Sequence, residues 1–516
     1  MKSGTPYGVE SRTGGPERAE KTERTEGRGT ALVDDSRALR FAIIGAGMAG
    51  ILSAIKLKDA GLTDFTVYEK ADRVGGTWRE NTYPGLACDV PSHLYSYSFA
   101  PTPEWSHRFS PGDEIQGYFE GVAHEHDIER QIRFGDAVTS CRFDDGTWHV
   151  ETESGQRDDV DVVIAATGVL HHPKLPDFEG LDEFEGAVFH SARWDHDVRL
   201  DGARVGIVGT GSTAVQMCSA LVSRVEKLLL FQRTAQWIMP QDNPPYSEDE
   251  KTEFRANPER LAELRANLTQ VFDTFANAIV DADSPEMQMI AGMCRENLER
   301  NVRDPELREA LRPDYQAACK RLIISPDFYD AIQQPNAELV TEAIERVEAG
   351  GVRTRDGRLH ELDVLVLATG FKTDAFMRPM TVIGRDGESL AQAWSARPSA
   401  YMSVSIPGFP NFFMLNGPNG PVGNFSLIEV AELQFGYIMQ LLAPLRSGER
   451  REVSATRDAM EQHEAARVEA VEKTVWVTGC RSWYLDDRGI PATWPWSFDR
   501  FRSEMHAPHA AAFEYR

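Results

Sequence analysis

The stretch Phe41-Ala42-Ile43-Ile44-Gly45-Ala46-Gly47-Met48-Ala49-Gly50 decides the fold of this chain of 516 residues. Its four leading apolar residues predict a buried strand, and the spacing Gly-x-Gly-x-x-Gly predicts a tight turn into a helix. The helical stretch continues to Ala60, where Gly61 can end it. Because Gly45, Gly47 and Gly50 have no side chains, a pyrophosphate can approach the backbone of the turn at a helix N-terminus.

An acidic residue completes this first fingerprint. The run Phe65-Thr66-Val67-Tyr68 predicts a second strand, and Glu69 closes it. A carboxylate in this place accepts hydrogen bonds from the ribose hydroxyls of a dinucleotide. Strand, glycine turn, helix and terminal acid occur together, so we predict a dinucleotide site here and not an isolated glycine turn.

A second fingerprint begins at Val205-Gly206-Ile207-Val208 and continues as Gly209-Thr210-Gly211-Ser212-Thr213-Ala214. Its next strand ends in Gln232-Arg233-Thr234, where no acid stands. A guanidinium binds a phosphate bidentately, whereas a carboxylate would repel one. We therefore predict FAD at the first turn, and NADPH at the second turn with Arg233 and Thr234 at its 2′-phosphate.

Two further runs repeat each other closely and give each fingerprint a closing strand. They are Asp161-Val162-Val163-Ile164-Ala165-Ala166-Thr167-Gly168 and Asp363-Val364-Leu365-Val366-Leu367-Ala368-Thr369-Gly370. Between about Tyr246 and Ala318, apolar residues recur at helical spacing among charges. The predicted fold class is therefore α/β, with two doubly wound Rossmann-like dinucleotide-binding domains and a helical insertion in the second.

The predicted domain boundaries follow from these patterns. We expect a disordered leader over 1–38, an FAD-binding domain over 39–182 and 370–516, an NADPH-binding domain over 183–245 and 320–369, and the helical insertion over 246–319. The leader is rich in Gly, Glu, Arg, Thr and Ser, and it offers almost nothing to bury.

Composition indicates an ordinary soluble enzyme of the cytoplasm. The net charge of −25 argues against nucleic acid or an anionic membrane as partner, and no apolar run is long enough to span a membrane. The six cysteines lie apart, without a Cys-x-x-Cys pair, so we expect buried thiols and neither a metal site nor a redox dithiol. The oligomeric state stays open.

Three stretches resemble the Baeyer–Villiger monooxygenases, specifically their single-chain class that contains FAD and uses NADPH. The first is Phe184-x-Gly186-x-x-x-His190-x-x-x-Trp194-Asp195, which matches the fingerprint of that family at every fixed position. The second is Gly75-Gly76-Thr77-Trp78-x-x-x-x-Tyr83-Pro84-Gly85-x-x-x-Asp89. The third is Cys319-Lys320-Arg321, where the family places its active-site arginine. The resemblance runs from about Phe41 to the C-terminus.

The resemblance implies roles for individual residues. Arg321 would be catalytic, and Asp89 would hold and orient its guanidinium. Lys320 would join Arg233 at the NADPH 2′-phosphate. His190 alone is more typical of a satisfied core histidine, and the resemblance assigns it to coupling domain movement to cofactor position. The residues expected near the flavin, besides those of the first fingerprint, are Gly76, Thr77, Trp78, Asp89 and Tyr95.

The implied activity is the insertion of one oxygen atom of O2 next to the carbonyl of a small ketone. The reaction would pass through a C4a-peroxyflavin, give an ester or lactone, and use NADPH as reductant. A cation such as Arg321 would favour the ionised peroxide and stabilise the oxyanion of its adduct. The identity of the ketone stays open.

Three alternatives predict different behaviour. A flavin monooxygenase that oxidises nitrogen or sulfur would not turn over ketones, and the Trp194-Asp195 ending disfavours it. A flavin disulfide reductase needs the Cys-x-x-Cys pair that is missing. A dinucleotide sensor would not consume NADPH faster when a ketone is added.

Two positions depart from the pattern of the family. Ala235 stands where a proline is common, and Asn424 stands where relatives often show histidine. These departures affect details of the NADPH loop and of the flavin pocket, and they leave the implied reaction class unchanged.

Overall fold

The computed structural model of the chain describes residues 38–422, 425–480, 482, 484–486 and 488–516. Within them, two parallel five-stranded sheets carry the two glycine fingerprints, so the predicted α/β fold with two dinucleotide-binding units is confirmed. The predicted leader lies outside the described residues except for Ala38, and Asn424 also lies outside them.

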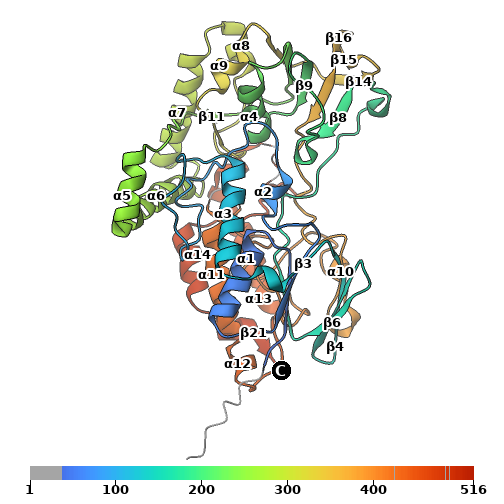
Figure 1. Cartoon of the computed structure of the whole chain (residues 1–516), viewed down its shortest axis with the longest axis vertical. Coiled ribbons are helices and arrows are strands. Elements are labelled where there is room, and N and C mark those ends of the chain that lie inside the picture. Colours follow the sequence, from blue (N-terminus) through green and yellow to red (C-terminus); the bar gives the residue numbers. More distant parts are fainter. Residues whose placement is uncertain (1–37, 423–424, 481, 483, 487) are drawn as a thin grey trace, which may run out of the picture. The chain divides into compact units, whose positions relative to one another are not determined.

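The first parallel sheet carries the first fingerprint. Its strands in spatial order are β19 (Phe412–Met414), β7 (Val162–Ala165), β1 (Phe41–Ile44), β2 (Phe65–Glu69) and β3 (Ile132–Phe134). Because β1 lies at the centre of the sheet, all four of its residues are buried. Helix α1 (Met48–Asp59) packs on β1 and β2, and on α11 (Leu427–Leu441) from the far end of the chain (Figure 1).

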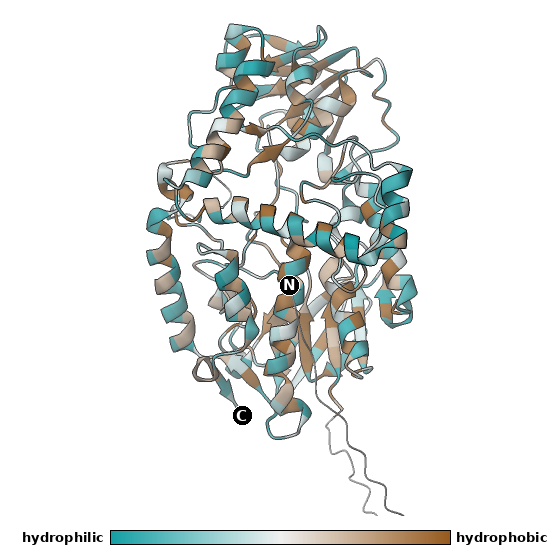
Figure 2. Ribbon diagram, turned by 90° about the vertical axis from the view of Figure 1, so that its left-hand side faces the viewer, coloured by the Kyte–Doolittle hydropathy of each residue, from teal (hydrophilic) through white to brown (hydrophobic). Residues whose placement is uncertain are grey.

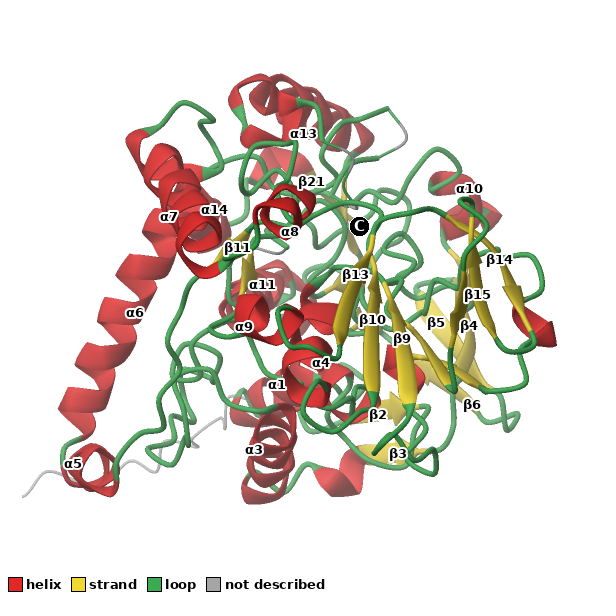
Figure 3. Ribbon diagram, turned by 90° about the horizontal axis from the view of Figure 1, so that it is seen from above, coloured by secondary structure: helices red, strands yellow, loops and turns green. Residues whose placement is uncertain are grey.

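The second parallel sheet carries the second fingerprint. Its strands in spatial order are β13 (Ala337–Val340), β10 (Lys227–Phe231), β9 (Arg204–Val208), β17 (Val364–Leu367) and β8 (Ala187–His190). Helix α4 (Ser212–Leu221) follows the glycine turn after β9 and packs against α9 (Phe328–Ile332). Figure 3 shows both helices beside β13, β10 and β9.

The chain crosses twice between the two sheets. It leaves the first sheet after β7, builds the second sheet, and returns after β17, so that β19 pairs with β7. On this topology we propose that 39–182 with 370–516 forms the FAD-binding domain and that 183–245 with 320–369 forms the NADPH-binding domain.

Smaller sheets extend each unit, and the sequence patterns did not predict them. The strands Val138–Asp144, Thr147–Thr152 and Ile344–Glu348 carry exposed residues among buried ones, and several others are only two or three residues long, so no apolar run marks them. The sheets are β18 (Thr381–Ile383), β4 (Val138–Asp144), β5 (Thr147–Thr152) and β6 (Arg157–Val160); β14 (Ile344–Glu348), β15 (Gly351–Thr354) and β16 (Leu359–Glu361); β11 (Ile238–Met239) and β12 (Ile323–Ile324); and β20 (Val453–Ala455) and β21 (Phe513–Tyr515).

The region between the two halves of the second unit is helical, as its spacing predicts. Side chains of Ser247, Asn257, Ser284 and Asp304 each accept a hydrogen bond from the first turn of the helix that follows, which fixes where it begins. These helices are α5 (Glu248–Ala256), α6 (Pro258–Ala278), α7 (Pro285–Asn301) and α8 (Pro305–Ala310).

The remaining helices complete the framework around the two sheets. They are α2 (Thr77–Glu80), α3 (Gly112–Glu125), α10 (Leu390–Ala393), α12 (Ala443–Arg446), α13 (Arg457–Ala470) and α14 (Phe498–His506). In Figure 2 the strands are largely hydrophobic, whereas the helices carry both hydrophobic and hydrophilic residues. None of the described helices combines the length and apolarity needed to cross a membrane.

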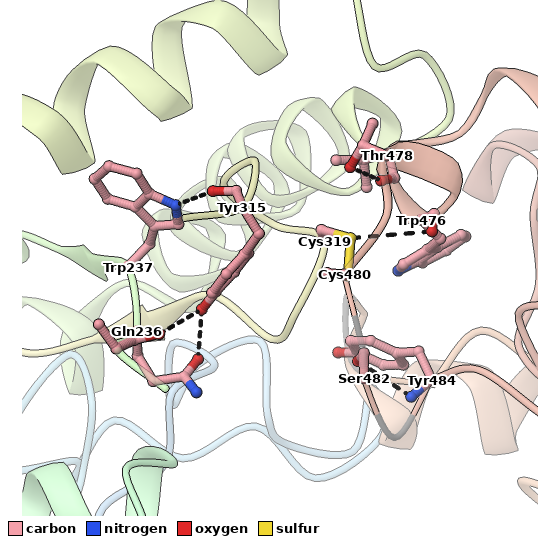
Figure 4. Close-up of a disulfide and its surroundings, with 11 residues drawn as sticks. Gln236, Trp237, Tyr315, Cys319, Trp476, Thr478, Cys480, Ser482 and Tyr484 are labelled. Carbon is pink, nitrogen blue, oxygen red and sulfur yellow. Dashed lines mark hydrogen bonds between the residues drawn. A yellow bond between two sulfur atoms is a disulfide. The ribbon is translucent and has the colours of Figure 1, made fainter. Parts of the chain in front are cut away.

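One expectation about the cysteines is wrong. Cys319 and Cys480 form a disulfide, with their Cα atoms 6.2 Å apart (Figure 4). The other four cysteines are free and buried, as expected. The two partners stand 161 residues apart, so only the fold brings them together and no local spacing could reveal the pair.

Candidate functional site

A cavity of about 1860 Å³ receives the ends of strands from both parallel sheets. Its lining includes the turns that follow β1 and β9 and the residues that follow β7 and β17. In α/β sheets such strand ends are where ligands bind. The predicted site residues that line it are Gly45, Gly47, Glu69, Gly76, Thr77, Trp78, Asp89, Tyr95, Gly209, Gly211, Ser212, Thr213, Arg233, Thr234, Lys320 and Arg321.

The two glycine turns are built alike. Gly45 has φ of 102° and Gly209 has φ of 120°, a region that favours glycine. Gly47 and Gly211 then stand at the N-caps of α1 and α4, and neither helix has a side-chain cap. The first backbone N–H groups of both helices therefore face the cavity without a side-chain acceptor, which suits an anion. Gly50 packs against the carbonyl of Gly45 instead of lining the cavity.

Glu69 is buried at the end of β2 and is already hydrogen-bonded. It accepts the Ala46 N–H at 2.8 Å and the Ala71 N–H at 3.0 Å, and Arg79 donates to it at 2.8 Å. The Ala46 contact ties the carboxylate to the first glycine turn. A carboxylate has about four acceptor sites, so these three donors leave capacity for a ribose hydroxyl.

The end of β10 carries positive charge, as its sequence predicts. Arg233 is exposed at the cavity, and Lys320 is close enough for Arg233 to help lower its pKa, although burial is the larger cause. The Thr210 hydroxyl donates to the Thr234 carbonyl at 2.8 Å, which holds this loop against the glycine turn. Arg233 and Lys320 repel each other, and a phosphate dianion bound near both would stabilise both positive charges.

Arg321 and Asp89 form a close ion pair in the cavity, although 232 residues separate them. The Arg321 Nε donates to Asp89 at 3.0 Å, and Nη2 donates to both carboxylate oxygens at 2.7 Å. Burial alone would lower the pKa of Arg321, but its interactions, of which the attraction of Asp89 is the largest, together raise the pKa. The guanidinium is therefore a permanent, oriented cation.

Aromatic side chains cover one side of the cavity and link the two units. The Trp78 ring N–H donates to the Tyr95 hydroxyl at 3.2 Å, and both rings line the cavity. Tyr83 also lines the cavity and reaches across to α4, where its hydroxyl donates to Gln216 at 2.8 Å. Gln216 in turn donates to the Ala87 carbonyl at 3.0 Å, so this side chain holds the 83–89 loop on the second unit.

The Phe184–Asp195 motif lies beside the cavity, and its five fixed residues do not line it. Phe184 is buried, and Gly186 lies against the Asp363 carbonyl. Trp194 packs edge-on against Phe189, and the Asp195 carboxylate accepts the Asp197 N–H.

His190 is fully engaged by the backbone around it. Its Nδ1 accepts the Ala192 N–H at 3.1 Å, so its Nε2–H donates to the Gly370 carbonyl at 3.0 Å. Burial lowers its pKa, so the neutral ring is favoured. A ring with both nitrogens committed is typical of a structural link and not of a proton carrier. The link joins the motif to the residue where the chain turns back toward the first sheet.

Asn416 and Gln216 also line the cavity, and neither was predicted from the sequence. The Oδ1 atom of Asn416 is buried and has no hydrogen-bond partner among the described residues. Leaving a buried acceptor unpaired costs about 1–3 kcal/mol, so a donor on a bound ligand would stabilise this site. The uncapped helices and this acceptor fit a dinucleotide and its ring system. The doubled Asn416-Gly417-Pro418-Asn419-Gly420-Pro421 was the available sequence signal, because it marks an unusual pair of turns.

Known proteins resemble this chain over most of its length. The family described as flavin-binding monooxygenase-like matches residues 38–250. An uncharacterized monooxygenase of Mycobacterium tuberculosis is 50% identical over 477 residues, which is 92% of this chain and 96% of that protein. A Baeyer-Villiger monooxygenase of Streptomyces coelicolor is 39% identical over 481 residues, 92% of each chain. The crystal structure of a cyclohexanone monooxygenase from Rhodococcus sp. Phi1 bound to NADP+ has a TM-score of 0.82 and 29% identity, and the match covers 93% of this chain and 99% of that one.

Proposed function

Because this chain belongs to the Baeyer–Villiger monooxygenase family of flavin monooxygenases, we propose that it inserts one oxygen atom of O2 next to the carbonyl of a ketone. The chain is an NADPH-dependent FAD monooxygenase. The balanced reaction converts ketone, O2, NADPH and a proton into an ester or lactone, NADP+ and water. The paired Arg321 and Asp89 in the cavity are the observation that carries this proposal.

Arg321 is proposed to stabilise negative charge on oxygen. Bound FAD, once NADPH has reduced it, supplies the activation of O2. The attack on a ketone needs an ionised oxygen nucleophile and produces an oxyanion, and a fixed cation favours both. Arg321 keeps its charge at every relevant pH, and Asp89 fixes the direction in which the guanidinium points. An enzyme that oxidises nitrogen or sulfur by a neutral oxidant has less need of such a cation.

The cofactors are proposed to occupy the two glycine turns. The turn at Gly45 and Gly47, with Glu69, would hold the adenosine and pyrophosphate of FAD. Its flavin ring would lie toward Gly76, Thr77, Trp78, Asp89 and Tyr95. The turn from Gly209 to Thr213 would hold the pyrophosphate of NADPH, and Arg233, Thr234 and Lys320 would hold its 2′-phosphate.

The Phe184–Asp195 motif is proposed to position one unit relative to the other. The support is the His190 link to Gly370 and the absence of its fixed residues from the described lining of the cavity. Phe184 and Trp194 would stabilise the link by packing, and Gly186 and Asp195 would shape the turns at its ends.

A panel of ketones tests the proposed reaction. Linear, cyclic and polycyclic ketones, cyclohexanone among them, would be supplied with NADPH and air. We expect ketone-dependent NADPH loss matched by an equal amount of ester or lactone for at least one class. Oxidation of amines or sulfides without any ester from the ketones would contradict the proposal and favour the heteroatom-oxidising alternative.

We expect Arg233→Ala to narrow the preference for NADPH over NADH. Arg233 is exposed, so its contact with the 2′-phosphate should be worth about 1.5 kcal/mol, or roughly tenfold in apparent NADPH affinity. Stopped-flow reduction of the flavin at varied NADPH and NADH measures both affinities.

Arg224→Ala is the matched control for this prediction. Arg224 is an exposed arginine just before the N-terminal end of β10, whereas Arg233 follows the C-terminal end of that strand. Arg224 pairs with Asp201. Its replacement should leave both affinities unchanged. Full NADPH preference in Arg233→Ala would show that the 2′-phosphate is held elsewhere.

A further inference from the structure

Tyr315 is a half-buried tyrosine that contacts both segments proposed to hold the 2′-phosphate of NADPH. Its hydroxyl lies 3.1 Å from the Ala235 carbonyl oxygen and 2.8 Å from the Oε1 atom of Gln236, and both oxygens accept from it. Figure 4 shows the hydroxyl directed at Gln236. Ala235 and Gln236 belong to the loop after β10, which also carries Arg233, and Lys320 stands five residues after Tyr315.

The loop after β10 is tied to the backbone of Tyr315 as well. The Trp237 ring N–H donates to the Tyr315 carbonyl at 2.6 Å (Figure 4). The Thr234 carbonyl accepts from the Thr210 hydroxyl, so the carbonyls of Thr234 and Ala235 are both held by hydroxyl groups. Ala235 has no ring that fixes its own φ, as a proline would, so these contacts restrain the loop from outside.

The aromatic ring of Tyr315 lies beneath the ammonium group of Lys320. The Nζ atom is 4.6 Å from the ring centroid, a distance at which the negative face of the ring attracts a cation. Among the described residues, none forms a hydrogen bond or an ion pair with this ammonium group, which lines the cavity. Its three N–H donors therefore remain for a ligand, while the ring restricts where the group can lie.

We propose that Tyr315 is a positioning residue that sets the preference of this enzyme for NADPH over NADH. This inference rests on the proposed 2′-phosphate site at Arg233 and Lys320. The hydroxyl holds the loop that carries Arg233, and the ring holds Lys320, so one side chain orients cations from two distant segments. Ordering long side chains costs conformational entropy, and a site that is ordered in advance avoids part of that cost on binding. NADH has no 2′-phosphate, so it gains nothing from this order.

Tyr315→Phe tests the loop contact, because it removes the hydroxyl and keeps the ring beneath Lys320. In the enzyme loaded with FAD, we expect the Kd for NADPH to rise about fivefold, the usual scale for one net hydrogen bond, and the Kd for NADH to stay unchanged. Inhibition by adenosine 2′,5′-bisphosphate should weaken by the same factor, whereas inhibition by AMP should not change. The limiting rate of flavin reduction and the flavin content should stay close to wild type. A merely structural tyrosine would lower the melting temperature and leave the ratio of the two affinities unchanged.

Tyr315→Leu tests the ring contact. Relative to Tyr315→Phe, we expect NADPH affinity to fall about threefold further, the scale of a cation–π pair at an exposed site. Because the ring is proposed to act through Lys320, this difference should vanish when both variants also carry Lys320→Ala. A difference that persists without the lysine would overturn the role of the ring.

Tyr118→Phe is the matched control. Tyr118 is also half-buried, its hydroxyl donates to the Ala100 carbonyl at 2.8 Å and accepts the Tyr97 N–H at 2.9 Å, and it is not among the described residues that line the cavity. This variant should keep the wild-type ratio of NADPH to NADH affinity, even where its melting temperature falls. The wild-type ratio in Tyr315→Phe would overturn the assignment.

Should Tyr315→Phe lose its flavin, Trp237→Phe tests the same contacts and leaves the tyrosine intact. It removes the ring N–H that holds the Tyr315 carbonyl, so it should narrow the preference for NADPH in the same direction. An unchanged ratio in this variant would then decide against the assignment.

The outcomes separate this inference from the proposals on which it rests. A full NADPH preference in Arg233→Ala removes the proposed 2′-phosphate site, and this inference with it. A narrowed preference in Arg233→Ala, together with a wild-type ratio in Tyr315→Phe, leaves that site standing and removes Tyr315 from it. Ester formation from ketones is measured separately and depends on neither result.

Discussion

The Arg321→Ala variant should bind FAD and accept hydride from NADPH, yet form almost no ester. Arg321 is assigned to the stage after flavin reduction, so its removal need not prevent reduction. A preorganised charged group of this kind is worth about 3–4 kcal/mol, or 10²–10³ in rate, and more where it also favours an ionised reactant. O2 should then leave as hydrogen peroxide, and NADPH consumption should match the peroxide released. Parallel assays of NADPH, peroxide and ester measure this balance.

Arg312→Ala is the matched control for this variant. Its side chain is 31% exposed, the same as that of Arg321, and it pairs with Glu299 and Glu309 outside the cavity. It should keep ester formation. Near wild-type ketone oxygenation in Arg321→Ala would remove the main reason for preferring attack on a carbonyl over oxidation of nitrogen or sulfur.

Asp89→Ala should also lower ester formation and raise peroxide release, but less than Arg321→Ala does. The arginine keeps its charge but loses three hydrogen bonds, so its direction becomes variable. We expect ester formation to fall about hundredfold, with peroxide making up most of the difference. Removing one partner of a partly buried ion pair also destabilises the fold, so the melting temperature should drop. The same product assays and a thermal melt give both values.

Asp273→Ala separates the catalytic effect from the loss of stability. Asp273 binds Arg502 through two hydrogen bonds, and its side chain is 22% exposed against 19% for Asp89. This control should lower the melting temperature while ester yield per NADPH stays at the wild-type level. An equal loss of ester yield per NADPH in both variants would mean that a general loosening of the fold causes the peroxide release, and not a changed orientation of the Arg321 guanidinium.

Local patterns predicted the parts of the fold that local chemistry dictates. The two glycine turns, their strands and Glu69 each lie within a single run of sequence, and their burial and hydrogen bonds agree with that reading. The antiparallel strands β4, β5 and β6 escaped prediction because their exposed faces interrupt the apolar pattern. Such strands form by pairing with other segments of the chain, and the spacing of apolar residues within one strand does not reveal that pairing.

The residues of the candidate site also fall into those that local sequence patterns predict and those that they do not. Arg233 could be found from the end of its own strand, because the missing acid is a local signal. The meeting of Arg321 with Asp89, 232 residues away, came only from the resemblance to a known family. The Cys319–Cys480 bond had no such guide, since it depends on a contact that only the folded chain creates, and only the doubled Asn-Gly-Pro turn pointed to Asn416.

The hydrogen bonds of His190 make the stability of the junction between the two units depend on pH. Only the neutral ring can accept from Ala192 and donate to Gly370 at once, because an imidazolium has donors on both nitrogens. Burial lowers the pKa of His190 in the folded protein, whereas an unfolded histidine titrates near about 6.5. The unfolded chain therefore takes up the proton first, so this stabilisation is complete above about pH 6.5 and declines as the pH falls below it. The melting temperature of wild type should fall more steeply between pH 7 and pH 5 than that of His190→Gln, which would make the junction one of the parts of the molecule that mild acid loosens.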